Sequence, residues 1–376
     1  GKDLVPIEVY KSGPSIFASL VHPLAYKTVC LVQQPIQHKG GLLIDLWKGK
    51  GPQDDCKSSR GILLGDNLGK MIQSVMRDKV RDNYVSTLHE TQLGGRPARG
   101  TDMGVHIADT FFAYTKAIGV SAAGLFFDVV SAFYSVIRPV VMQCDCSDHD
   151  IVGLIHALSL PAETFHDLAA EMKRHGTIMS QSGLHPHLEA VVSEFHQHTW
   201  FANQGVADVC HARTGSRPGM PFADVVFNYL LKRVLDRVHE SLNVAGITPK
   251  FTWDGIRAPS PNLDDSCSTD ISEVAWVDDL VCLMSSKSTV DLLAMVQVAA
   301  EVFFDNFLVY GLRTNLKVGK SMAMIAFRGP NANSARINLH VTHNNEIKFC
   351  SKFLVGTQTL KCCFDYKHLG RMQDYK

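Results

Sequence analysis

The spacing of apolar and polar residues along the chain predicts a mixture of helices and strands. Apolar residues recur at helical spacing in 67–84, 101–118, 222–238 and 290–310. Short apolar runs typical of buried strands lie at 124–127, 274–277 and 280–284. We expect a further helix at 131–137, mostly helical structure in 145–215, and loop and strand in 311–327. These elements together indicate an α+β fold.

The segment 67–84 is expected to form a helix with one buried face and one basic face. Its apolar positions are Leu68, Met71, Ile72, Val75, Met76 and Val80. Its other face carries Lys70, Arg77, Lys79 and Arg81.

Two adjacent aspartates, Asp278 and Asp279, separate two of the predicted strands. With strands on either side, the pair lies at the tip of a tight hairpin, where its carboxylates are open to a metal ion. Asp is also common in solvated surface turns, because its side chain bonds to the nearby backbone. The hairpin alone leaves both interpretations open.

Asp128 directly follows the predicted strand 124–127. If that strand and the hairpin are neighbours in one antiparallel sheet, Asp128 lies beside Asp278 and the carboxylates form a site for two divalent cations. Mg²⁺ suits such a site, because it binds a few carboxylates and keeps its other positions for water and phosphates. Two ions placed in this way support phosphoryl transfer.

The composition is that of an ordinary globular protein, since 45% of the 376 residues are hydrophobic and 20% are charged. No uninterrupted apolar run is long enough to cross a bilayer, and the first residues lack a secretory signal, so we expect an intracellular protein without a membrane partner. The chain begins with Gly1, which suggests a segment of a longer protein. The ten cysteines have no regular spacing and are expected to be reduced thiols.

The net charge of zero conceals an uneven distribution. Residues 1–100 carry 14 Lys or Arg against 9 Asp or Glu, and residues 311–376 carry 11 against 3. Residues 101–310 therefore hold 12 of the 37 basic and 25 of the 37 acidic groups, a net charge of −13. An acidic middle between basic ends suits a metal centre with phosphate-binding walls, and it equally fits ends that are merely solvated.

The region between 145 and 215 is rich in histidine. Nine of the 17 histidines lie between 149 and 211, and Cys144-Asp145-Cys146 comes just before them. Cys and neutral His are the usual ligands of zinc, but the spacing matches no finger pattern. Helices that carry partly buried or exposed histidines account for the same composition.

Several short motifs follow one another along the chain. They are Trp47-Lys48-Gly49-Lys50-Gly51, Arg60-Gly61-Ile62-Leu63-Leu64, Gln92-Leu93-Gly94-Gly95-Arg96-Pro97-Ala98-Arg99-Gly100-Thr101, Phe127-Asp128-Val129-Val130-Ser131-Ala132-Phe133-Tyr134-Ser135-Val136, Gly219-Met220-Pro221 with Phe227-Asn228, Trp276-Val277-Asp278-Asp279, Gly311-Leu312-Arg313-Thr314-Asn315 with Lys320-Ser321, and Tyr366-Lys367-His368-Leu369-Gly370. In this order, over residues 45–370, they resemble the reverse transcriptases of non-LTR (LINE-type) retrotransposons.

The resemblance implies a right-hand polymerase fold whose antiparallel palm sheet is backed by helices. It implies an N-terminal extension at 1–45, fingers at 46–120, a palm at 121–327 with the His-rich insertion, and the end of the palm with the primer grip at 328–376. A thumb is expected to be missing, and a thumb and an endonuclease are expected in the rest of a larger polyprotein. The implied partners are an RNA template, a DNA primer and deoxynucleoside triphosphates, in the nucleus and cytoplasm.

The resemblance also implies roles for the acidic residues. Asp128 and Asp278 are expected to bind two Mg²⁺ ions, or Mn²⁺, with help from the backbone carbonyl of Val129. Asp279 is expected to complete the acidic cluster. Phe133 is expected to stand under the sugar and exclude a 2′-hydroxyl.

Other positions are expected to contact the nucleotide or the primer. Those that approach the triphosphate or the template backbone are Arg60, Lys70, Arg96 and Arg99. Gly219 lets the backbone approach the nascent base pair, and Lys320 assists the leaving pyrophosphate, with Lys317 as a competitor for that role. The primer end is expected to rest on Tyr366, Lys367, His368, Leu369 and Gly370.

Each of these positions also has a plain structural interpretation. Phe133 fits a packed core aromatic, Lys70 a wet helix face, and Arg96 and Arg99 solvated loop charges. Gly219 fits a turn before a helix.

The chain departs from the family pattern around the hairpin and the second palm motif. Pro218 stands where the family has Gln, and Trp276 and Val277 are larger than the usual pair. Two other interpretations stay open: an inactive relic that retains only RNA binding, and an unrelated α+β enzyme with a metal-carboxylate centre.

Overall fold

The computed structural model describes residues 5–55, 58–144, 147–247, 251–253, 269–271 and 273–374. The described chain is an α+β protein with mixed sheets, as the sequence predicts. It folds into two compact units, each assembled from three stretches of sequence. The first comprises Gly1–Thr87, Phe133–Ser159 and Ala169–Leu230, and the second comprises Leu88–Ala132, Leu160–Leu168 and Leu231–Lys376.

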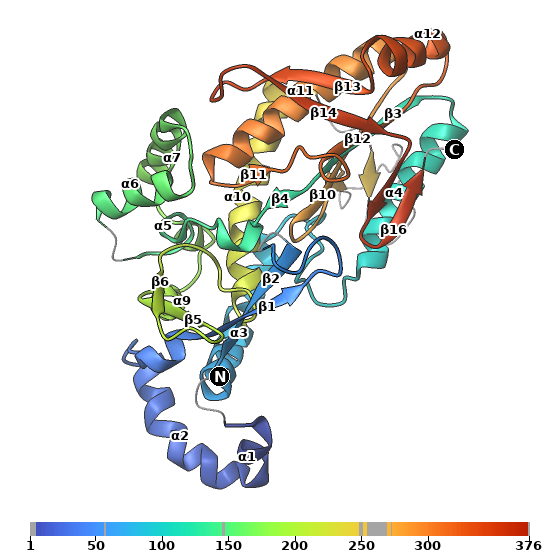
Figure 1. Ribbon diagram of the computed structural model, residues 1–376. Helices are drawn as coiled ribbons and strands as arrows, with labels where there is room; N and C mark the ends of the chain where they lie inside the picture. Colours follow the sequence, from blue (N-terminus) through green and yellow to red (C-terminus); the bar gives the residue numbers. More distant parts are fainter. Residues whose placement is uncertain are drawn as a thin grey trace. The chain divides into compact units, whose positions relative to one another are not determined.

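A six-stranded sheet forms the centre of the second unit (Figure 1), with the strand order β13-β14-β12-β3-β10-β9. Its strands are β3 (Ser121–Phe127), β9 (Glu273–Trp276), β10 (Asp279–Ser286), β12 (Met322–Ala326), β13 (Glu346–Cys350) and β14 (Thr357–Cys363). The strand β3 is antiparallel to both β10 and β12. The three predicted strands are thus confirmed, and β3 and the hairpin β9–β10 are neighbours in one sheet.

Two helices cover the opposite faces of this sheet. Successive residues of a strand point to opposite faces, so Phe126 and Phe127 face different helices. Phe126 belongs to a buried cluster with Phe111 of α4 (Thr101–Ala117). Phe127 stacks on Phe303 of α11 (Thr289–Val309) with 4.6 Å between ring centroids. The predicted helices 101–118 and 290–310 are therefore confirmed as the two outer layers.

The helix α11 has the length and apolar composition of a membrane span, alone among the helices of the described residues. Core helices share these properties, and 61% of its apolar window is buried inside the structure. Phe303 and Phe307 pack against Phe127 of the sheet. Packing therefore explains its apolar composition.

The remaining elements of the second unit are short. They are β4 (Val129–Val130), β7 (Thr252–Trp253), β8 (Thr269–Asp270), β11 (Arg313–Thr314), α12 (Ala332–Ile337), the π-helical turn η4 (Asn338–Thr342), β15 (Asp365–His368) and β16 (Arg371–Asp374). The six short strands form three two-stranded sheets, which pair β11 with β4, β15 with β16 and β7 with β8.

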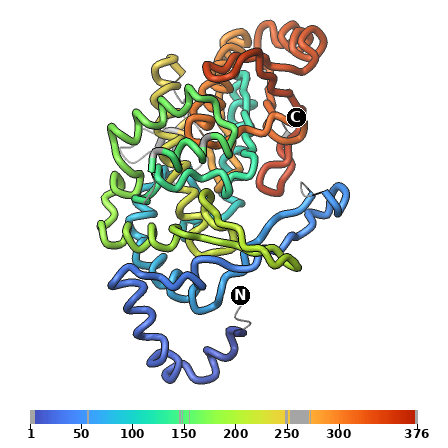
Figure 2. The backbone as a smooth tube through the Cα atoms, turned by 60° about the vertical axis from the view of Figure 1, so that its left-hand side comes forward, coloured from blue at the N-terminus to red at the C-terminus, as the bar shows by residue number. Residues whose placement is uncertain are grey.

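The first unit contains a four-stranded sheet of order β2-β1-β5-β6, in which β1 and β5 are parallel. Its strands are β1 (Gly40–Trp47), β2 (Ser59–Gly65), β5 (Thr199–Asn203) and β6 (Val209–Ala212). Its helices are α1 (Ile7–Ser12), α2 (Pro14–Val29), η1 (Ile36–Lys39), α3 (Asn67–Thr87), α5 (Arg138–Val141), α6 (Asp148–Ala157), α8 (Ile178–Gln181) and α9 (Pro186–His196). Figure 2 shows α1 and α2 at one end of this unit.

Two helices contribute residues to both units, α7 (Ala162–His175) and α10 (Ala223–Val244). The latter confirms the helix predicted at 222–238. The His-rich region is mostly helical, as predicted, and it also contains the strands β5 and β6, which its sequence did not predict. Asp145 and Cys146 lie outside the described residues.

The predicted helix at 131–137 is wrong, because only the turn η3 (Ala132–Tyr134) is helical. Ser131 has a φ of +51°, and this left-handed residue interrupts a helix. The carbonyl of Phe133 accepts from the Ser216 backbone N–H at 2.7 Å. A partner distant in sequence thus replaces the helical hydrogen bond.

The predicted buried face of α3 is partly wrong. Ile72, Met76 and Val80 are buried as expected, but Met71 and Val75 are exposed. The Tyr84 ring instead packs edge-on against Tyr229 of α10 at 5.7 Å. The buried face of α3 is therefore rotated about the helix axis relative to its most apolar face. The helices and strands that pack against α3 decide which side faces inward.

Replacing Val277 by Asn is expected to stabilise the protein. Val277 occupies the turn between β9 and β10 with a φ of +56°, which is strained for a β-branched residue and tolerated by Asn. We expect the free energy of unfolding in urea to rise by about 1 kcal/mol. The control is Val209→Asn in β6, an exposed strand valine that lacks this strain and for which no gain is expected. A Val277→Asn protein no more stable than the wild type contradicts this interpretation.

Candidate active site

The hairpin β9–β10 carries the acidic pair on a two-residue turn. Trp276 pairs with Asp279, so that Val277 and Asp278 form the turn. On the other side, Leu280 pairs with Phe127 of β3. Continued by one position beyond the end of β3, this antiparallel register places Asp279 opposite Asp128. By this register, two carboxylates from neighbouring strands lie at the same end of the sheet, and the residue opposite Asp128 is Asp279 and not Asp278.

Asp128 is held by the segment that precedes β12. Its Oδ2 accepts from Asn315 Nδ2 at 2.8 Å, and its Oδ1 lies 3.2 Å from Lys320 Nζ. Its backbone N–H donates to Ser321 Oγ at 2.9 Å, and its carbonyl accepts from the Asn315 N–H at 2.8 Å. Since side chain and backbone are both engaged, the carboxylate has a fixed orientation at 23% exposure.

Lys320 is the lysine that the structure brings to the carboxylates. Its ammonium group is half-exposed and paired with Asp128. Lys317 is exposed, and its backbone N–H donates to Asn315 Oδ1 at 3.4 Å. Of the two candidates for one role, only Lys320 reaches Asp128 in this conformation.

Tyr366 of β15 lies beside the same carboxylates. Its ring stacks on Phe126 with 4.2 Å between centroids, and its hydroxyl donates to the Lys320 carbonyl at 2.6 Å. Burial raises the pKa of the Tyr366 hydroxyl, and the negative charges of Asp279 and Asp128 raise this pKa further. The predicted primer-grip segment and the acidic pair thus belong to one cluster.

The other residues predicted for the primer grip form the hairpin β15–β16. Leu369 and Gly370 are its turn, both with positive φ, and Lys367 is exposed. His368 is 2% exposed, and this burial lowers its pKa to about 4. A cavity of about 380 Å³ lies between this turn and α4, where Arg371 pairs with Asp109 at 3.3 Å.

The loop before α4 is fastened to the acidic hairpin. The Leu93 N–H donates to the Ala275 carbonyl at 2.8 Å, and a Cβ added to Gly94 would lie 2.5 Å from the Val277 nitrogen. Arg96 donates to Glu90 at 3.0 Å and to the Leu88 carbonyl at 2.8 Å.

The two arginines of this loop are engaged within the loop. The Arg96 side chain is 7% exposed, and Arg99 Nη2 lies 3.9 Å from Glu90. Arg96 therefore braces the loop, which differs from the interpretation of it as a solvated loop charge. A contact of either arginine with phosphate stays a prediction.

The other predicted nucleotide contacts belong to the first unit. Phe133 is half-buried with its ring 5.3 Å from that of Phe227, Arg60 is exposed on β2, and Lys70 is half-buried. Burial lowers the pKa of Lys70. Val129, the predicted carbonyl ligand, lies in the second unit on β4, where it pairs with β11.

Gly219 adjoins β2 within the first unit. It has a φ of +101°, and a Cβ there would lie 2.5 Å from the Leu63 carbonyl oxygen. The Leu63 N–H donates to the Pro218 carbonyl at 3.2 Å. This position therefore requires glycine for two reasons, its conformation and its close approach to a strand.

Asn315 and Ser321 are the residues that sequence reasoning left without a role. Both flank the loop before β12, and both bond to Asp128. Both residues belong to one of the motifs of the sequence, and this was the signal that could have predicted a role for them. Only the fold shows that their loop reaches the end of β3.

The donor chemistry of the cluster fits Mg²⁺. Carboxylate and carbonyl oxygens are the ligands that this ion takes, and one or two carboxylates suffice when water and phosphates complete its shell. Within the described ranges, no group of three or more His, Cys, Asp or Glu side chains is arranged to hold a metal. Asp128, Asp278 and Asp279 stay the predicted ligands of the ions.

No protein-family model and no curated protein matches this chain. The fold and the site define an α+β protein with an acidic cluster at the end of an antiparallel strand pair.

Replacing Gly94 by Ala is expected to destabilise the protein by about 1–3 kcal/mol, because the new Cβ collides with the backbone of the acidic turn. The control is Gly153→Ala in α6, where nothing lies within 4 Å of the added atom and a gain of about 0.5–1 kcal/mol is expected. Thermal unfolding of both proteins measures the difference. Equal effects of the two substitutions would show that the loop does not press on the hairpin.

Lowering the pH from about 6.5 to 4 is expected to destabilise the protein through His368. Its pKa falls from 6.5 to about 4 on burial, so the unfolded chain binds more protons in this window and stability falls with pH. His368→Leu is expected to remove up to roughly 3 kcal/mol of this dependence. His196, whose pKa burial lowers to about 3, contributes equally in both proteins. Urea unfolding at several pH values gives the two slopes, and identical slopes contradict the prediction.

Proposed function

We propose that this protein is an RNA-directed DNA polymerase of the non-LTR retrotransposon type. The single observation that carries the proposal is the pairing of β3 with β10, which brings Asp128 and Asp279 from distant motifs to one end of a sheet. In this proposal the six-stranded sheet with α11 is the palm, and α4 lies in the stretch 46–120 expected for the fingers. The pair β1–β2 and α3 belong to the fingers.

The proposed reaction joins a deoxynucleotide to a primer. The primer 3′-hydroxyl oxygen bonds to the α-phosphorus of the triphosphate, the bond from that phosphorus to the bridging oxygen breaks, and pyrophosphate leaves as the hydroxyl loses its proton. Bound Mg²⁺ supplies a lowered pKa of the attacking hydroxyl and stabilisation of the leaving oxyanion. Asp128, Asp278 and Asp279 are its proposed ligands, with the Val129 carbonyl.

Lys320 is proposed to act twice, first beside Asp128 before a metal binds and then on the pyrophosphate that leaves. In this structure its ammonium group lies 3.2 Å from Asp128 and offsets part of the repulsion between two opposed carboxylates. With the carboxylates neutralised by bound Mg²⁺, Lys320 would be free to meet the leaving pyrophosphate. Its half-exposed side chain has the freedom that this exchange needs.

The primer end is proposed to rest on the hairpin β15–β16. Tyr366 is fixed by its stacking on Phe126 and by its hydrogen bond to the Lys320 carbonyl. Because the same tyrosine lies near Asp279 and Asp128, a strand held on this hairpin would bring its 3′-hydroxyl toward the acidic cluster. Phe133 is proposed to exclude a 2′-hydroxyl, as the resemblance implies.

Primer extension on an RNA template with Mg²⁺ and deoxynucleotides tests the proposal. We expect the wild type to incorporate nucleotides and Asp128→Ala and Asp278→Ala to lose about 10³-fold or more, equivalent to ~4 kcal/mol of transition-state stabilisation. Asp291→Asn, an exposed carboxylate in the first turn of α11, is the control that should retain activity. No incorporation by the wild type, or full activity of Asp278→Ala, contradicts the proposal.

A further inference from the structure

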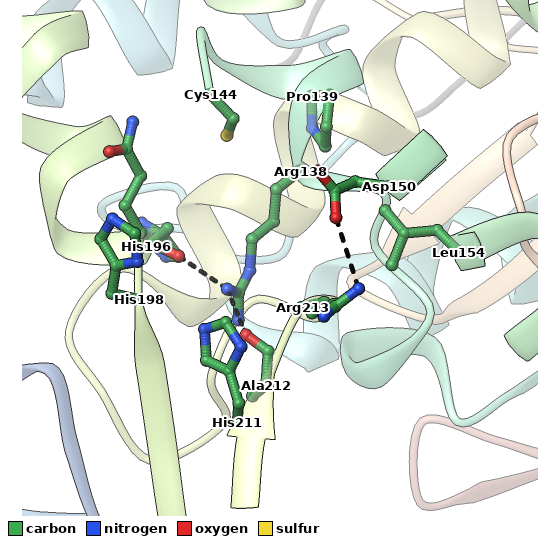
Figure 3. Close-up of a pocket in the computed structure, with 11 residues that line it drawn as sticks. Arg138, Pro139, Cys144, Asp150, Leu154, His196, His198, His211, Ala212 and Arg213 are labelled. Carbon is green, nitrogen blue, oxygen red and sulfur yellow. Dashed lines mark hydrogen bonds and ion pairs between the residues drawn. The ribbon is translucent and has the colours of Figure 1, made fainter. Parts of the chain in front are cut away.

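A second cavity lies wholly within the first unit, in the His-rich region. It encloses about 200 Å³ and is lined by Arg138, Pro139, Cys144, Asp150, Leu154, His196, Gln197, His198, His211, Ala212 and Arg213. At about 30 Å³ for each water, this space holds several waters or one larger polar group. Figure 3 shows its side chains, most of which carry nitrogen donors.

One wall of the cavity is built by the pairing of β5 with β6. Thr199 pairs with Ala212, so the preceding position places His198 opposite Arg213. His211 lies two residues from Arg213 and therefore on the same face of the strand pair. The rings of His198 and His211 are nearly parallel, 11° apart in plane, with 6.4 Å between centroids. Three nitrogen-bearing side chains thus share one surface.

The interior of the cavity is formed by a buried arginine. Arg138 is 4% exposed, and its guanidinium donates to five oxygens, all from carbonyls or a hydroxyl. Figure 3 shows two of these bonds, to the carbonyls of His196 and Ala212. Burial lowers the pKa of Arg138 to about 10, so it keeps its charge at neutral pH. The hydrogen bonds of Arg138 are satisfied, and within the described part of the chain no carboxylate is among its hydrogen-bond partners.

A carboxylate does line the cavity, and it balances the other arginine. Asp150 lies 3.3 Å from Arg213 and accepts from the Ser147 hydroxyl at 2.6 Å. With Arg138 and Arg213 charged and Asp150 ionised, the lining keeps one net positive charge. Burial lowers the pKa of His211, and the charges of Arg213, His198 and Arg138 lower it further. The potential at that ring is therefore positive.

A second buried arginine adds to this charge. Arg217 is 5% exposed and donates to the carbonyl of Phe195 at 2.6 Å. Burial and the neighbouring Arg138 lower its pKa to about 9. Buried charges without an opposite charge are costly, so an anion bound in the cavity would lower the free energy of this whole group.

We propose that this cavity binds a phosphate group, either on a nucleic-acid backbone or as a free phosphate. Arg213 and the two imidazoles offer N–H donors from the strand pair, and Arg138 supplies charge from the interior. Nitrogen donors grouped on one surface beside a buried positive charge suit the oxygens of a phosphate group. The site is independent of the acidic cluster, so it can exist whether or not that cluster binds a metal.

Titration of the full chain with inorganic phosphate tests the site, with sodium chloride at equal ionic strength as the reference. Imidazole signals in NMR spectra and the heat of binding are the measurements. We expect a saturable shift of the His198 and His211 signals and an affinity about tenfold lower in Arg213→Gln, whose side chain is 59% exposed and can be replaced without emptying the interior. Arg174→Gln, an exposed arginine at the end of α7, has the same charge change and should bind as the wild type.

Competition identifies the source of the phosphate. A short RNA that displaces phosphate from the wild type, and does so less well in Arg213→Gln, assigns the site to a nucleic-acid backbone. An RNA that fails to displace bound phosphate assigns it to free phosphate. The proposal is overturned if phosphate shifts the signals no more than chloride does, or if Arg213→Gln binds phosphate as tightly as Arg174→Gln.

Discussion

The antiparallel pairing of β3 with β10 places the acidic residues and the core together. It runs over seven residue pairs, from Ser121 with Ser286 to Phe127 with Leu280, and every residue of β3 is buried. A shift of one residue would exchange the faces of the strand and send the Phe126 side chain toward α11. Core packing therefore determines which aspartate of the hairpin faces Asp128.

The negative charges of the aspartates at the end of the β3–β10 pairing lower stability, and neighbouring polar and basic side chains offset part of this effect. Carboxylates placed opposite each other repel, and Asp128 is stabilised by hydrogen bonds from Asn315 and Lys320 of the segment before β12. The cavity of the first unit has the opposite sign, because Arg138 is buried among carbonyls. The acidic excess of residues 101–310 does not predict this, since a regional sum of charges cannot say which of them share a cavity.

Much of the second unit was predictable because its signals are long and local. The helices α4 and α11 and the hairpin β9–β10 agree with the sequence, since each has a sustained apolar period or a clear turn between strands. The acidic cluster was predictable in kind, because motif order linked Asp128 to the hairpin. That Asp279 is the residue opposite Asp128 could be determined only from the register of β3 and β10.

Local pattern determined by itself the fold class, the main helices and the strands that carry the carboxylates. Tertiary structure decided which face of α3 is buried, why 131–137 is not a helix, that Arg96 braces its own loop, and that Arg138 and His211 share a cavity. Each of these depends on a partner far away in the sequence. Apolar periodicity records how a segment prefers to fold, but it does not record which neighbour that segment will meet.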